Sequence, residues 1–230
     1  MQIIIDESLG MPNEVIENAI IKKVELKDDS SLADIVEKDS GGIIAKKLSL
    51  KKSDQDSEME GMIQSLEEYG EILYIYDSFI NNDAWLKRIR TWAYPEKKLY
   101  LFNGAENRAF TIYLLEQLKE STFEEWYHSS ARHSRKFTIT NDIKYQSNYL
   151  LLKKMKNKQY HLLDSKQQTK ITSGKKKDLL EQFMSIPSKE IYIASRKKIM
   201  HNNNAIKFFE LKNYSLPVCS DQTDIFIPHY

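Results

Sequence analysis

The clearest pattern of apolar and polar positions lies between residues 58 and 80. Residues 58–69 carry apolar side chains at helical spacing, and Gly70 is suited to ending that helix. The following run, EILYIYDSFI at 71–80, is rich in β-branched and aromatic residues and predicts a buried strand. This stretch therefore predicts a helix that leads directly into a strand.

A second strand and two further helices are expected immediately downstream. Asn82 can cap a helix whose inner face carries Leu86, Ile89 and two tryptophans, and Pro95 stops it. The segment KLYLF at 98–102 predicts a strand, and 106–119 predicts a helix. The resulting strand–helix–strand–helix order is typical of a parallel sheet with right-handed crossovers, and it places the chain in the α/β class.

The N-terminal part is less regular. MQIII at 1–5 predicts a strand, and the apolar spacing of residues 13–23 predicts a helix after Pro12. Residues 31–38 predict a short helix and 43–50 a strand, before a polar stretch that ends at residue 57. We therefore expect residues 1–57 to form an N-terminal extension that packs on a core domain of residues 58–230.

The C-terminal half predicts a series of strands with one basic helix, which would make the sheet a mixed one. The expected strands are 122–127, 135–140, 147–153, 160–163, 190–194 and 205–212, and the expected helix is 175–184.

Composition indicates the cellular compartment and argues against a membrane span. Cys219 is the only cysteine, so an internal disulfide is excluded and a reducing, cytoplasmic compartment is favoured. No apolar run approaches the roughly 20 residues that a membrane span needs, and the acidic N-terminus does not resemble a secretory signal. We therefore expect no membrane partner.

The net charge of +1 conceals an asymmetry along the chain. Residues 1–80 contain 8 lysines and 18 acidic residues, whereas residues 151–212 contain 15 basic and 5 acidic ones. A basic segment of this kind can bind a polyanion such as DNA or RNA, although mutual attraction of the two halves would produce the same pattern.

Candidate chemistry concentrates in the segment that begins at His133. His133 and Arg135 are two residues apart at the start of a strand, so their side chains leave the same face. Thr140 follows near the strand end, and Ser147-Asn148 opens the next predicted strand. An imidazole that can attack phosphorus and a guanidinium that can hold two oxygens would suit a phosphodiester.

This segment resembles the signature of the phospholipase D-like phosphodiesterases, which reads His-x-Lys, four residues, Asp, six residues, Gly-Ser. His133 stands at the nucleophile, Arg135 at the lysine, Thr140 at the aspartate and Ser147-Asn148 at the Gly-Ser pair. The family's downstream asparagine is Leu151 here. The resemblance covers about residues 58–160 and implies a phospholipase D-like mixed sheet.

The resemblance also implies a mechanism. A phosphohistidine would form on His133 without a metal or other cofactor, while Arg135, Thr140 and Asn148 hold the phosphate. Because the chain has one motif where family enzymes combine two, an active homodimer is expected. Further phosphate or nucleic-acid contacts are assigned to Ser147, Lys136, Lys153, Lys154 and Asp77, the last of which lies near a strand end.

A second candidate site is Glu210-Leu211-Lys212, which follows an apolar strand. A Glu-x-Lys at a strand end is what restriction-like nucleases use to hold a divalent ion, with Glu190 or Asp178 as the further acid. Three function classes therefore stay open at this level. They are a phospholipase D-like nuclease, a non-catalytic module that binds nucleic acid or protein on the same scaffold, and a metal-dependent nuclease.

Overall fold

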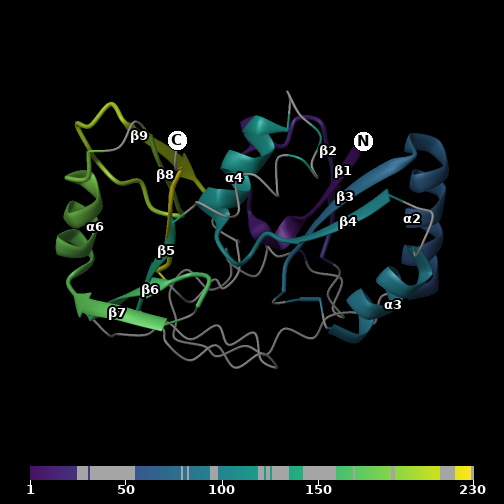
Figure 1. Ribbon diagram of the computed structural model, residues 1–230, viewed down its shortest axis with the longest axis horizontal. Coiled ribbons are helices and arrows are strands. Elements are labelled where there is room, and N and C mark those ends of the chain that lie inside the picture. Colours follow the sequence, from purple (N-terminus) through teal and green to yellow (C-terminus); the bar gives the residue numbers. More distant parts are fainter. Residues whose placement is uncertain are drawn as a thin grey trace.

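The computed structural model contains two β-sheets joined by a central helix (Figure 1). It describes residues 1–24, 31, 55–78, 80, 81, 83–93, 98–118, 122, 125, 135–141, 159–167, 169–187, 190–212 and 221–228. Four predicted elements lie wholly or almost wholly outside these residues: the helix at 31–38 and the strands at 43–50, 122–127 and 147–153.

The first sheet is parallel, with the order β2-β1-β3-β4. Its strands are β1 (Gln2–Asp6), β2 (Ala19–Lys22), β3 (Glu71–Tyr76) and β4 (Lys98–Asn103). The strands predicted at 1–5, 71–80 and 98–102 are thus confirmed. β1 and β2 belong to this sheet although they fall within the predicted extension 1–57.

The prediction of a helix at 13–23 is wrong. The chain forms a single 3-10 turn at Asn13–Val15 and then the strand β2, in which Ile20 pairs with Ile4 of β1. Ile20 and Ile21 are β-branched and favour a strand, and the edge of β1 offers them a hydrogen-bonding partner that the local spacing of apolar residues does not reveal.

Two helices cover one face of the first sheet (Figure 1). α2 (Gln55–Tyr69) ends at Gly70, whose φ of 70° requires a residue without a side chain, and α3 is Asp83–Ala93. Met62, Leu66, Trp85 and Ile89 pack there on Ile4, Ile72 and Tyr74. Both helices were expected from the sequence, and α2 spans the predicted domain boundary at 57/58.

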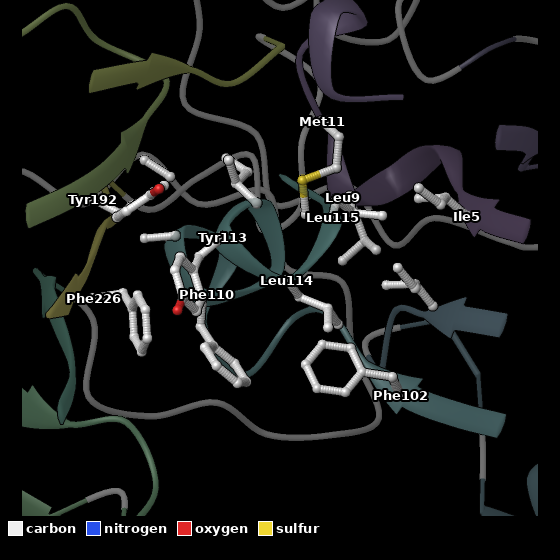
Figure 2. Close-up of a cluster of buried hydrophobic side chains, with 14 of the residues drawn as sticks. Ile5, Leu9, Met11, Phe102, Phe110, Tyr113, Leu114, Leu115, Tyr192 and Phe226 are labelled. Atoms are coloured by element: carbon white, nitrogen blue, oxygen red, sulfur yellow. The ribbon is translucent and has the colours of Figure 1, made fainter. Parts of the chain in front are cut away.

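α4 (Arg108–Gln117) lies between the two sheets and is buried on nearly every side, from Arg108 to Leu115. Such all-round burial is typical of a helix that is enclosed by two layers. Figure 2 shows Phe110 and Tyr113 of α4 beside Phe226 and Tyr192 of the second sheet, and both rings lie 4.8 Å from the Phe226 ring centre. On the opposite side the same apolar cluster includes Ile5 and Phe102 of the first sheet.

The second sheet is mixed, with the order β7-β6-β5-β10-β8-β9, and only β8 and β9 run parallel. Its strands are β5 (Arg135–Thr140), β6 (Tyr160–Asp164), β7 (Thr169–Gly174), β8 (Ile191–Ser195), β9 (Ile206–Glu210) and β10 (Thr223–Ile227). α6 (Lys176–Met184) covers the face opposite α4 through Leu179, Leu180 and Phe183. The sequence predicted α6 and four of these strands but missed β7 and β10.

The mixed α/β class is confirmed, with two sheets where the sequence predicted one. In the described part of the chain, no helix combines the length and apolarity needed to cross a membrane.

Candidate functional site

The carboxyl ends of the parallel strands form the best-defined candidate site. β2 lies on one side of β1 and β3 on the other, so the chain connections diverge between β1 and β3. Open α/β sheets bind ligands at such a switch point, outside the carboxyl ends of the strands. Here those ends face the second sheet, because β4 ends at Asn103 and α4 begins only five residues later, between the sheets.

Asp6, the last residue of β1, is the centre of a buried polar network at this edge. It is 1% exposed. The Tyr74 hydroxyl donates to its Oδ1 at 2.8 Å, while the backbone N–H of Asp77 and the Asn81 amide donate to its Oδ2 at 2.7 and 2.6 Å. Burial raises the pKa of Asp6 to about 6, although the Lys22 charge and the hydrogen bonds from Asp77 and Tyr74 act to lower it.

Asp77 occupies the corresponding position at the end of β3. It is fully buried and accepts a hydrogen bond of 2.7 Å from the Ser8 hydroxyl. The sequence correctly placed it at a strand end, but a buried carboxylate beside Asp6 would repel a phosphate instead of holding it. Ser78, the next residue, is exposed and places a hydroxyl group at the same edge.

A second polar network fixes the start of α4 to the second sheet. The Asn107 side chain caps α4 by accepting from Phe110 N at 2.9 Å, and its amide donates to Phe137 O and Ser165 Oγ at 3.0 and 3.1 Å. Asp224 accepts from the backbone N–H of Arg108 at 3.1 Å and from the Thr138 hydroxyl at 2.9 Å.

Arg108 extends this network to the first sheet. Its Nε donates to Leu9 O at 3.2 Å, and its Nη1 lies 3.5 Å from Asp224 Oδ2, with both side chains almost fully buried. The carboxyl edge of the first sheet and the polar face of the second are therefore held in one fixed arrangement around the start of α4.

Among the residues predicted for phosphodiester cleavage, Arg135 and Thr140 lie on opposite faces of β5. They are five residues apart, so the alternation of a strand separates them; Arg135 is exposed, and Thr140 is fully buried. Lys136 forms an ion pair of 3.2 Å with Glu106. The other predicted contacts lie outside the described residues: His133, Ser147, Asn148, Lys153 and Lys154.

The residues of the predicted metal site are also apart. β8 and β9 are parallel, with Ile191 opposite Ile206 and Ser195 opposite Glu210. Glu190 precedes β8, whereas Glu210 lies opposite the last residue of β8. The two side chains are therefore separated by about 16 Å in the direction of the strands. Glu190 instead pairs with Lys207 at 3.2 Å, and the described residues contain no group of three or more potential metal ligands.

Comparison with solved structures identifies the architecture. A DegV family protein of Thermus thermophilus, described by its fatty acid binding, aligns with a TM-score of 0.62 and 10% identity over 99% of both chains. DegV of Bacillus subtilis, described as a fatty acid binding protein, aligns with a TM-score of 0.61 and 10% identity over 99% of both chains. The chain has the DegV fold.

A third structure agrees with this result. The DegV family protein Cg2579 of Corynebacterium glutamicum has a TM-score of 0.54 and 9% identity over 98% of this chain and 96% of its own. No protein-family model matches the sequence, and no curated protein is significantly similar to it.

The phospholipase D-like assignment is therefore wrong, since the structural neighbours along the full chain are DegV proteins. The same comparison overturns the predicted nuclease and phosphodiesterase functions, including the metal-dependent alternative. It also overturns the predicted binding of DNA or RNA. The expected homodimer followed from the phospholipase D-like resemblance and loses its basis. A spacing of His, Arg, Thr and Ser-Asn is too short a pattern to outweigh an end-to-end fold match.

Sequence reasoning missed most of the residues that the structure brings together, among them Asp6, Ser8, Asn107, Arg108 and Asp224. A signal existed for two of them. Asp6 ends an apolar strand in the same way as Asp77, and Asn107 precedes an apolar helix as a capping residue would. Asp224 lies in a strand that the sequence did not predict.

Proposed function

We propose that this protein binds a long-chain acyl ligand, with a fatty acid as the first candidate, at the junction of its two sheets. The observation that carries the proposal is the fold match over 99% of both chains to two proteins described as binding fatty acids. Fold alone does not determine function, so local chemistry must supply further support.

The junction has the two chemical features that an amphiphile requires. Apolar side chains of both sheets meet around α4, and polar groups follow directly at the carboxyl ends of β1 and β3. Binding sites for small molecules combine a largely apolar lining with a few placed polar groups in this way. The ligand's head group would lie at the polar edge and its chain along the apolar junction.

Ser78 is the residue we assign to the head group. It directly follows the buried Asp77, it is exposed, and its hydroxyl can both donate and accept. The nearby carboxylates of Asp6 and Asp77 disfavour a further negative charge. We therefore expect a neutral head group, such as a protonated acid or a primary amide, to bind more tightly than an ionised carboxylate.

Titration of the delipidated protein with a 16-carbon fatty acid and with its amide tests these expectations. We predict binding of both, with the amide tighter at pH 8 and the acid tightening as the pH falls toward 6. Ser78→Ala should weaken binding about tenfold through loss of one hydrogen bond, whereas Ser185→Ala, at an exposed position just after α6, should leave it unchanged. Absence of saturable binding of either ligand would refute the proposal.

A further inference from the structure

The connection from β8 to β9 forms a basic surface together with the start of α6. Arg196, Lys197 and Lys198 follow β8, and Lys175, Lys176 and Lys177 stand at the start of α6. The two segments meet at one carboxylate: Lys176 Nζ lies 2.9 Å from Asp221 Oδ1, and Lys197 Nζ lies 3.2 Å from Asp221 Oδ2. Two of these six cations, one from each segment, therefore share the carboxylate of Asp221.

The charges of this surface remain accessible at its periphery. The side chains of Lys177 and Lys197 are 84% and 73% exposed, and Lys175 and Lys198 are also exposed. Asp178 and Glu181 on α6 reduce the positive charge, and Glu181 lies 3.7 Å from Lys177. The two segments still carry a net positive charge.

Met200 projects from the middle of this connection with 92% of its surface exposed. Its neighbours turn inward: Ile199 packs against the cluster under α6, and Nδ1 of His201 is buried. Asn203 then anchors the connection to α6 by donating to Met184 O at 3.0 Å. The exposure of Met200 therefore belongs to an anchored segment that presents one apolar side chain to the solvent.

We propose that this surface, formed by residues 175–177 and 196–200, docks the protein on an anionic lipid bilayer. The lysines and Arg196 would lie among the anionic head groups, and Met200 would enter the apolar boundary below them. Basic residues next to a solvent-exposed apolar side chain are the combination that binds the interface of a membrane. Such peripheral docking needs no segment that crosses the bilayer, and it extends the proposed function without depending on it.

Charge complementarity and Met200 together select a bilayer over a soluble polyanion. A nucleic acid or an acidic protein would satisfy the lysines, but it would gain little from an exposed apolar side chain that follows them in the chain. A bilayer rewards both features, because anionic head groups lie directly above an apolar layer.

Co-sedimentation of the full chain with vesicles tests the proposal. We predict binding to phosphatidylcholine vesicles that contain about a third phosphatidylglycerol, weak binding to pure phosphatidylcholine, and loss of binding at high salt. Met200→Asp and Lys197→Glu/Lys198→Glu should each reduce the bound fraction at least fivefold. The matched control Lys87→Glu, an exposed lysine on α3, should reduce it much less.

Two results would overturn the proposal. One is equal sedimentation of the wild type and both surface variants. The other is loss of binding in the double lysine variant but full binding of Met200→Asp, which would make the surface a purely electrostatic one. Fatty acid titration of the same variants separates this test from the proposed function, because the altered residues lie outside the junction of the two sheets.

Discussion

Asp6 and Asp221 are partly or fully buried carboxylates whose pKa values shift in opposite directions. Burial raises the pKa of Asp6 to about 6. Burial acts on Asp221 in the same sense, but the hydrogen bond and charge of Lys176, the Tyr160 hydroxyl and the Lys197 charge outweigh it, so the pKa of Asp221 lies below its usual value. The difference arises because Asp221 has two cations within 3.2 Å, whereas hydrogen bonds to Asp6 come mainly from neutral groups.

These shifts predict opposite pH dependences of stability. Because the pKa of Asp6 is higher in the folded than in the unfolded state, protonation of Asp6 favours the folded state. This contribution is fully present below about pH 4 and is lost as the pH rises through about 6. The free energy of unfolding of the wild type, relative to Asp6→Asn, should therefore fall by about 2 kcal/mol between pH 4 and pH 7.5.

Asp221→Asn provides the comparison with the opposite sign. The contribution of Asp221 is present above about pH 4 and is lost as the pH falls through its lowered pKa. Urea unfolding of the three proteins at a series of pH values measures both trends. A wild-type advantage over Asp6→Asn that grows with rising pH would contradict the account of Asp6.

At the carboxyl edge of the first sheet, residue 104 must be a glycine because no space is left for a side chain. A methyl group there would lie 2.7 Å from both Ile75 Cγ2 and Leu9 Cδ1, within the central apolar cluster. Gly104→Ala should lower the free energy of unfolding by about 1–3 kcal/mol through overpacking.

Gly61, in the interior of α2, is the matched control because a methyl group there meets nothing within 4 Å. Gly61→Ala should raise the free energy of unfolding by about 0.5–1 kcal/mol, since alanine favours a helix. Denaturant unfolding compares the two variants, and an equal effect of both substitutions would show that the close approach at Gly104 is absent.

At the scale of elements, Asn107 performs two separable tasks for α4. Its side-chain oxygen caps the helix, and its amide binds the backbone and side-chain acceptors of β5, β10 and the turn at Ser165. Asn107→Ala should cost about 2–4 kcal/mol, and Asn107→Ser should recover about 1 kcal/mol of that loss by restoring the cap. Thermal and urea unfolding check the order wild type, Ser, Ala; equal stability of the two variants would exclude the capping role.

Elements with strong local signals could be predicted, whereas those that depend on distant partners could not. α2, β3, α3 and β4 combine clear periodicity with a stop signal such as Gly70, so the sequence alone specifies them. The segment of β2 was predicted as a helix because the local spacing of its apolar residues suits a helix, whereas its strand conformation depends on pairing with β1. β10 was missed although its TDIFI segment is fully buried, because the strand depends on pairing with β5 and β8 on both sides.

The candidate site was less predictable than the fold because its residues are far apart in the sequence. Ser8 and Asp77 are 69 residues apart, and Arg108 and Asp224 are 116 apart, yet each pair is in direct hydrogen-bonding contact. A local spacing such as that from His133 to Asn148 is visible in the sequence, whereas a network assembled by two sheets is not.

At the scale of the whole molecule, the two sheets form one arrangement around α4. The backbone N–H of Lys212, after β9, donates to Gly10 O at 2.9 Å, and Arg108 binds Leu9 O, so both connections fix the second sheet to the turn that follows β1. This places the polar carboxyl edge of the first sheet against the second sheet, as a ligand held at their junction would require.

Native mass spectrometry of the gently purified protein is the direct test of acyl-ligand binding. We predict a population whose mass exceeds that of the chain by one long-chain acyl ligand, which is released on denaturation and identified by its mass. We also predict that added fatty acid converts the remaining protein to a one-to-one complex. A protein that carries no such ligand and takes up none from excess fatty acid or acyl amide would contradict the proposed binding.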